Sequence, residues 1–148
     1  MTRKRTADPW MPADEYGRSL PYFTVNLLVK DLARSLPFYR DVLGARVEYQ
    51  DADFVALSLE RLSFMLHADH AYDQHPIYAR LQRSPERGTG AELRVLGLDP
   101  DAVESRARAC GATIVQPATN KGHGWREMMV ADPDGYVWAI GIPIPSLH

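Results

Sequence analysis

The sequence has little cysteine, no long apolar run and no strong excess of either charge. Its one cysteine, Cys110, excludes an internal disulfide framework, and its place on an apolar helical stripe predicts a buried thiol in a reducing compartment. No window approaches the roughly 18 apolar residues of a membrane span, and the basic run at residues 3–5 lacks the apolar stretch of a secretory signal. We therefore expect a cytoplasmic protein with no membrane partner.

The charges exclude a nucleic-acid partner. The 19 acidic and 17 basic side chains are interspersed and give a formal charge of −2, so no basic field is available to attract a polyanion. Motifs for common chemistry are also missing, because Gly122-His-Gly124 alone does not make a nucleotide loop and no Ser/His/Asp motif occurs. With 45% apolar residues, the chain can bury a core as one domain or as two small modules.

The first half of the chain reads as a strand, a helix and three further strands. The β-rich stretch 22–29 precedes an apolar stripe at helical spacing that ends at Gly44, and residues 45–49, 54–59 and 62–67 are β-like. Pro37 interrupts the helix, which predicts a regular helical start near Ser35 so that the proline lies in the first turn. The stripe consists of Leu32, Leu36, Tyr39 and Leu43.

The second half repeats this order. Residues 92–96 form the expected strand, and a helix follows from Asp99 to Gly111, in which Asp101 and Glu104 fit a capping box. The spacing from Asp31 to Asp99 equals the spacing from Gly44 to Gly111 within one residue. A strand from Ala112 to Val115 and a hairpin over 126–141 complete the repeat. Such a repeat indicates a duplicated supersecondary unit.

These patterns predict an α+β fold of two βαβββ modules that form one structural domain with a concave cleft. The modules cover residues 21–75 and 91–144. Residues 76–90 form the expected linker, because Pro and Gly are frequent in and around this segment. We expect one helical turn within it, at residues 77–81. Residues 1–20 are polar and predict a tail, in which Trp10 is the expected contact with the body of the protein or with a partner.

Two segments resemble the vicinal oxygen chelate superfamily, the group of glyoxalases, bleomycin-resistance proteins and dioxygenases. They are VKDLARSLPFYRDVLG at residues 29–44 and DPDGYVW at residues 132–138, and the resemblance spans residues 21–143. It implies the paired-module fold and a homodimer. It does not select one activity, since the superfamily holds epimerases, transferases and non-catalytic binding proteins as well.

Catalytic members of this superfamily bind a divalent metal through His and Glu side chains on four strands. The resemblance places those four positions at Thr24, Met65, Glu92 and Ala139, and Glu92 is the one plausible ligand among them. A catalytic site needs about three imidazole or carboxylate ligands. We therefore expect no metal and no cofactor, and the sequence is closest in character to the metal-free bleomycin-resistance-like branch. His67, two residues after Met65 on the same strand face, would add at most a second ligand.

The residues that would face the cleft suit a small, partly aromatic ligand, which the protein would bind or sequester. Trp125 can stack on a planar molecule and Arg126 can pair with a carboxylate. Trp138 alternates with Ala139 and is expected in the core. The expected ligand-binding residues are Thr24, Asn26, Met65, His67, Glu92, Arg94, Trp125, Arg126 and Ala139.

Other interpretations remain open. A metal-dependent lyase, isomerase or dioxygenase is the main alternative, with displaced ligands from His67, Glu92, His123 and Glu127. In a metal-free enzyme, Glu92 or Glu127 would act as a general base, which requires a raised pKa. Glu92 and Arg94 either line the cleft and contact a ligand or simply form an ion pair with each other. The His and Asp residues of segment 67–75 indicate either a metal site or a solvated loop.

Overall fold

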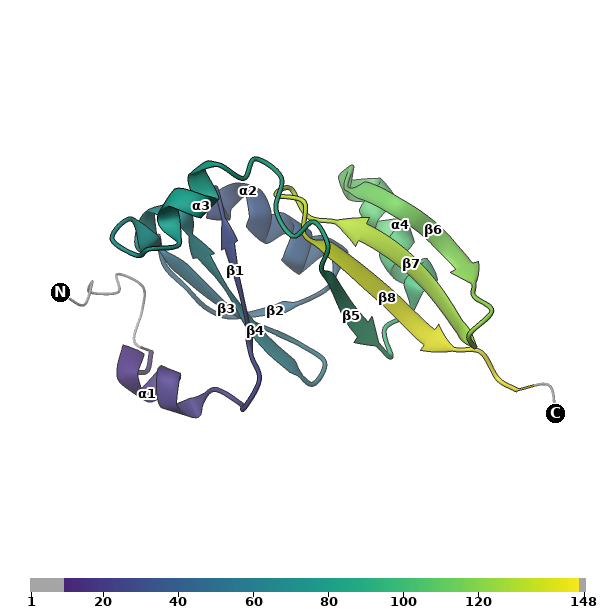
Figure 1. Ribbon diagram of the computed structural model, residues 1–148. Coiled ribbons are helices and arrows are strands. Elements are labelled where there is room, and N and C mark those ends of the chain that lie inside the picture. Colours follow the sequence, from purple (N-terminus) through teal and green to yellow (C-terminus); the bar gives the residue numbers. More distant parts are fainter. Residues whose placement is uncertain (1–9, 147–148) are drawn as a thin grey trace. The chain divides into compact units, whose positions relative to one another are not determined.

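The predicted order of strand, helix and three strands occurs twice along the chain. The computed structural model describes residues 10–146, so residues 1–9 of the expected tail lie outside the described residues. The chain divides into two compact units (Figure 1). The first contains the described residues up to Leu32 together with Ala45–Leu81, and the second contains Ala33–Gly44 and the described residues from Gln82 onward.

The first unit contains a four-stranded sheet in the order β1-β4-β3-β2. The strands β1 and β4 are parallel and the other pairs are antiparallel. The four strands are β1 (Val25–Val29), β2 (Arg46–Gln50), β3 (Phe54–Leu59) and β4 (Leu62–Ala68). Three short helices flank them, namely α1 (Ala13–Ser19), η2 (Asp69–Tyr72) and α3 (Tyr78–Gln82). The helical turn expected at residues 77–81 is therefore confirmed as α3.

The two faces of this sheet differ in composition. Side chains alternate along each strand, so the register assigns each residue to one face. One face is apolar, and five of its side chains are 1% exposed or less, namely Val29, Val55, Leu57, Phe64 and Leu66. The other, which we call the first-sheet face, carries Asn26, Tyr49, Phe54, Ala56, Met65 and His67. A face with both aromatic and polar side chains suits ligand recognition.

The helix that follows β1 changes type at its proline. It begins as α2 (Leu32–Pro37) and continues as η1 (Phe38–Val42), a π-helix in which the Leu43 N–H donates to the Phe38 carbonyl at 3.1 Å. The prediction of a regular start near Ser35 is therefore wrong, because the helix begins at Leu32. Pro37 is the last residue of α2 and has no N–H to donate. The hydrogen-bond pattern changes from α-helical to π-helical directly after it.

The second unit contains a sheet in the order β5-β8-β7-β6, the same arrangement as in the first. Helix α4 packs against β6, β7 and β8 through Val103 and Ala107, which are fully buried. Trp138 is 1% exposed, so its predicted place in the core is confirmed. The elements are β5 (Glu92–Leu96), α4 (Pro100–Cys110), β6 (Thr113–Asn120), β7 (Trp125–Ala131) and β8 (Val137–Pro143).

Two predictions about α4 are wrong. The N-cap is Asp99, whose side chain accepts the Asp101 N–H at 2.9 Å, while the Glu104 carboxylate accepts the Ala118 N–H instead of closing a capping box. Cys110 is exposed rather than buried, because it is the last helical residue and no further turn covers it. Gly111 ends the helix with φ 70°, as expected for a left-handed C-terminal glycine.

A buried polar network joins η1 to the turn between β7 and β8. The Asp132 carboxylate accepts the N–H groups of residues 134–136, each at 2.9 Å, and the Tyr39 hydroxyl at 2.6 Å. The Ser35 hydroxyl donates to Asp134 at 3.2 Å. Burial, followed by the charge of Asp132, raises the pKa of Tyr39 well above its ordinary value. Segment 132–138 is therefore a structural motif that fixes the helix to the hairpin.

The α+β prediction with two βαβββ modules is confirmed. Among residues 10–146, no helix is long and apolar enough to cross a membrane.

Candidate functional site

Aromatic rings run in a row along the first-sheet face. Phe54 lies between Tyr49 on one side and His67 on the other, with ring centroids 6.2 and 4.8 Å away. The row continues from His67 to Tyr72 at 5.3 Å and from Tyr72 to His75 at 5.1 Å. These separations lie within the range in which aromatic pairs attract each other. The face therefore offers a surface on which one more flat ring would stack.

The N-terminal segment covers one end of this row. Trp10 stacks on Tyr49, and Tyr16, on helix α1, meets Phe54 edge-on at 5.4 Å. Trp10, Tyr16 and Leu20 pack on the buried cluster of Tyr49, Phe54, Ala56 and Met65. Met65, one of the predicted ligand-binding residues, is 6% exposed beneath them. The segment expected to be a tail thus includes a helix that closes the apolar end of the face.

The other end of the row is polar and half-buried. The Asn26 amide donates to the Tyr72 hydroxyl at 2.8 Å, and its oxygen lies 2.7 Å from His67 Nδ1. Because that oxygen can only accept, His67 carries a proton on Nδ1 in this arrangement. The Thr24 hydroxyl, just before β1, is buried without a hydrogen-bond partner among the described residues. Asn26 and His67, both predicted from the sequence, therefore meet directly.

A charged network lies on one face of the second sheet. Arg94 donates to both Glu92 and Glu127, and His123 Nε2 lies 3.2 Å from Glu127 Oε1. Glu127 is 3% exposed, so its carboxylate depends on these partners. Ala139 stands opposite Arg94 on one side and opposite Met129 on the other. We call this surface, which includes the four charged or titratable side chains and Ala139, the second-sheet face.

The network sets the charge state of Glu127. Burial raises the pKa of this carboxyl, but the hydrogen bonds from His123 and Arg94 outweigh it and the pKa is lowered overall. The hydrogen bonds that Arg94 donates, first to Glu127 and then to Glu92, raise the pKa of Arg94. A general base active near neutral pH requires the opposite shift. The lowered pKa therefore disfavours Glu127 as a general base.

The other two predicted residues of β7 point in different directions. Trp125 is half-buried and lies near Gly141, where an added Cβ would be 3.7 Å from the indole. Arg126 points toward α4 and binds both carboxylate oxygens of Asp101 at 2.7 Å. Residues that are adjacent in a strand face opposite sides, so Arg126 does not share the second-sheet face with Glu127. The expected carboxylate partner of Arg126 belongs to the protein itself.

The residues do not fit a metal site of the kind the resemblance implies. Of the four corresponding positions, Thr24, Met65 and Ala139 lack a suitable donor, and Glu92 binds Arg94. In the described part of the chain, no group of three or more His, Cys, Asp or Glu could hold a metal ion. The segment 67–75 consists of the end of β4, the short helix η2 and a turn, and its His70 pairs with Asp53 at 2.6 Å.

Four aromatic residues of this site were not predicted from the sequence as ligand-binding residues: Trp10, Tyr49, Phe54 and Tyr72. Phe54 and Tyr49 were assigned to strands, and the β3–β4 and β2–β3 registers would have placed them on the face of Met65 and His67. The missing information was the bulge in β2 between Val47 and Tyr49, which turns Tyr49 onto this face.

Comparisons with known proteins agree with this architecture. The family model described as Glyoxalase/Bleomycin resistance protein/Dioxygenase superfamily matches residues 20–140. An uncharacterized protein of Mycobacterium tuberculosis (strain H37Rv) is 27% identical over 132 residues, which cover 86% of this chain and 78% of the relative.

Solved structures show the same fold. A glyoxalase/bleomycin resistance protein/dioxygenase from Nocardioides has a TM-score of 0.67 at 19% identity, covering 90% of this chain and 93% of that one. TioX from Micromonospora sp. ML1 has a TM-score of 0.61 at 21% identity, covering 86% and 100%. A genomically encoded fosfomycin resistance protein from Listeria monocytogenes has a TM-score of 0.61 at 16% identity, covering 86% and 95%.

Proposed function

Because the chain belongs to the glyoxalase/bleomycin resistance protein/dioxygenase superfamily, we propose that it binds a small, partly aromatic molecule on the first-sheet face without a metal ion. The observation that carries this proposal is the row of rings from Tyr49 to His75. The row is covered at its apolar end by Trp10 and is half-buried at its polar end. A ligand enters at the polar end, beside His67 and Tyr72.

The polar end would orient the ligand. A flat ring that stacks on Tyr72 or His67 extends the existing row, and each such aromatic pair contributes about 0.5–1.5 kcal/mol beyond the buried area. The Asn26 amide holds both rings through its two hydrogen bonds, so the stacking surface is fixed before the ligand arrives. Preorganisation of this kind lowers the entropic cost of binding.

The second-sheet face supports a metal-free mode of binding. Arg94 already pairs with both Glu92 and Glu127, which are the carboxylates a cation would use. Removing Arg94 from these carboxylates to admit a metal would cost the charge-assisted hydrogen bonds.

A thermal-shift screen of protein purified without chelator tests the proposal, with a panel of aromatic antibiotics, aromatic metabolites and divalent metals. A ligand at 100 times its Kd stabilises the native state by about 2.7 kcal/mol, which raises Tm by roughly 5–10 °C. We expect an aromatic compound to give this shift, and His67→Leu to remove it. His70→Leu, an exposed histidine three residues further on, is the matched control and should leave the shift unchanged.

One result would reverse the proposal in favour of the metal-dependent enzyme. That result is a flat response to every aromatic compound together with a large shift for one divalent metal that is lost in Glu92→Gln. A shift with an aromatic compound that survives in His67→Leu would also contradict the proposed site, since the ligand would then lie elsewhere.

A further inference from the structure

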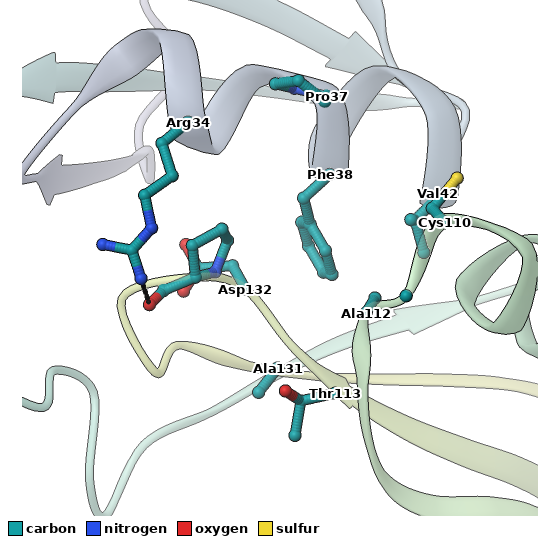
Figure 2. Close-up of a pocket in the computed structure, with 11 residues that line it drawn as sticks. Arg34, Pro37, Phe38, Val42, Cys110, Ala112, Thr113, Ala131 and Asp132 are labelled. Carbon is teal, nitrogen blue, oxygen red and sulfur yellow. Dashed lines mark hydrogen bonds between the residues drawn. The ribbon is translucent and has the colours of Figure 1, made fainter.

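A pocket lies in the second unit, lined by residues other than those named for the two sheet faces. It has a volume of about 260 Å³ and lies between the π-helix η1, the C-terminal end of α4 and the adjoining ends of β6 and β7 (Figure 2). Its volume is slightly below the roughly 300–1,000 Å³ of pockets for drug-sized ligands. It therefore suits a molecule of a few carbon atoms or a single ring.

Most of the pocket wall is apolar. Phe38 and Val42 project into it from η1, and Ala112 and Ala131 line the side formed by the sheet (Figure 2). Phe38 and Val42 are 5% and 1% exposed, so the floor of the pocket is continuous with the core, while its rim is open to solvent. A hydrocarbon group placed here would be removed from water on the side that faces η1.

One end of the pocket carries a positive charge. The exposed guanidinium of Arg34 makes one hydrogen bond among the described residues, to the Pro133 carbonyl at 2.8 Å, and a guanidinium has five N–H donors. The other charged residue of the wall, Asp132, already accepts three backbone N–H groups and the Tyr39 hydroxyl. The charge presented to a ligand is therefore positive.

The local backbone gives an independent reason to regard this pocket as a site. A π-helical turn is rarer and less favourable than an α-helical one, and such turns are frequent at functional sites. Here the π-turn of η1 supplies both Phe38 and Val42 to the wall, since residues four apart lie on nearly the same side of so wide a helix. The π-helical turn and the pocket thus coincide.

We propose that this pocket binds a small organic carboxylate, with the carboxylate on Arg34 and the hydrocarbon part between Phe38 and Ala131. The Arg34 fork can pair with both oxygens of a carboxylate, which gives such pairs direction as well as strength. The residues that line this pocket are not those of the first-sheet face, so the proposal can be tested independently of the proposed function.

The probes are hexanoate and phenylacetate, each compared with its uncharged amide. Binding is measured by two-dimensional NMR of the full chain, through the amide signals of Gly111, Ala112 and Thr113. Alkylation of Cys110 by iodoacetamide is a second readout, because this exposed thiol lies on the rim of the pocket. We expect the acids, and not the amides, to move these signals and to slow alkylation.

Arg34→Gln should weaken carboxylate binding about tenfold or more, the usual loss when a hydrogen bond to a charged group is removed. The matched control is Arg40→Gln, which removes an exposed arginine of the same helix that pairs with Asp41 and does not line the pocket. Ala131→Leu places a larger side chain in the pocket wall and should weaken binding of both acids. Equal binding of acids and amides, no binding of either, or equal affinity in Arg34→Gln would overturn the proposal.

Discussion

The indole of Trp10 stacks on the phenol ring of Tyr49, with centroids 4.4 Å apart and planes 9° from parallel. This contact joins the N-terminal segment to a strand of the first sheet almost 40 positions later in the sequence. It also covers an apolar surface formed by Phe54, Ala56 and Met65. The N-terminal segment is therefore part of the fold of the first unit rather than a solvated extension.

Trp10→Ala should lower the free energy of unfolding by about 1–3 kcal/mol, less than the 3–5 kcal/mol typical of a fully buried aromatic residue, because Trp10 is only partly buried. Trp10→Phe keeps a ring over Tyr49 and should recover most of the loss. Urea denaturation of the three proteins measures the difference. A change below about 0.5 kcal/mol in Trp10→Ala would show that the docked segment contributes nothing to stability.

The buried carboxylate of Glu127 gives a second prediction, for acidic pH. Its pKa is lowered because contacts with His123 and Arg94 outweigh burial, so it contributes stability that is present above the ordinary glutamate pKa and is lost as pH falls through the lowered value. Arg94→Gln leaves the carboxylate without one partner and should destabilise the protein at pH 7 by about 1–3 kcal/mol. The acid-unfolding midpoint should also move to higher pH.

The control for this experiment is Arg108→Gln, which breaks an exposed pair with Glu104 and should change the stability at pH 7 by less than about 0.5 kcal/mol. Circular dichroism recorded during acid titration gives the midpoints. An unchanged midpoint in Arg94→Gln would mean that Arg94 does not stabilise the charged form of Glu127.

Tyr39 gives the corresponding prediction at alkaline pH. Burial and then the nearby Asp132 raise the pKa of Tyr39, so the native state keeps this phenol neutral. The stability that Tyr39 contributes is therefore fully present below the ordinary tyrosine pKa of about 10. It is lost as the pH rises toward the raised pKa. Tyr39→Phe should lose about 1.5–3 kcal/mol at pH 7 with the hydrogen bond to Asp132. Between about pH 9 and 11 its stability should fall less steeply than that of the wild type.

Tyr78→Phe, which removes the phenol of a half-buried tyrosine at the start of α3, provides the control. Denaturant titrations at several pH values measure the slopes. If Tyr39→Phe and the wild type lose stability in parallel, then ionisation of Tyr39 is not what destabilises the protein in alkali.

The sequence predicts strands and helices well where buried apolar residues recur at the regular spacing of a strand or a helix. The strands at residues 54–59 and 92–96 and the helix ending at Gly111 agree with the structure, because alternation and a left-handed terminal glycine are local signals. Helix α1 was missed since it contains no buried residue and exists through the contacts of Tyr16 and of the neighbouring Trp10. Such tertiary contacts do not produce a periodic pattern of apolar residues in a helix of seven residues.

The candidate site was predicted less completely, for related reasons. Asn26 and His67 were found because strand parity places them on one face. The side of Arg126 depends on the register between β7 and β8, which sequence does not determine, and the structure pairs it with Asp101 on the other face. The exposure of Cys110 depends on where the helix ends relative to its packing partners.

The final prediction concerns self-association. Tyr22 and Phe23 are 110% and 78% exposed, and two adjacent aromatic side chains in water are the kind of surface that marks a protein interface. The family resemblance implies a homodimer, and we propose that a second copy of the chain covers these two side chains. Phe23→Ser should then weaken the dimer at least tenfold, since aromatic residues dominate interface energies.

Sedimentation velocity over a range of concentrations measures the dissociation of the dimer. Val115→Thr, at an exposed position of the second unit, is the control. A wild-type protein that is monomeric throughout, or a dimer equally stable in Phe23→Ser, would exclude this surface as the interface.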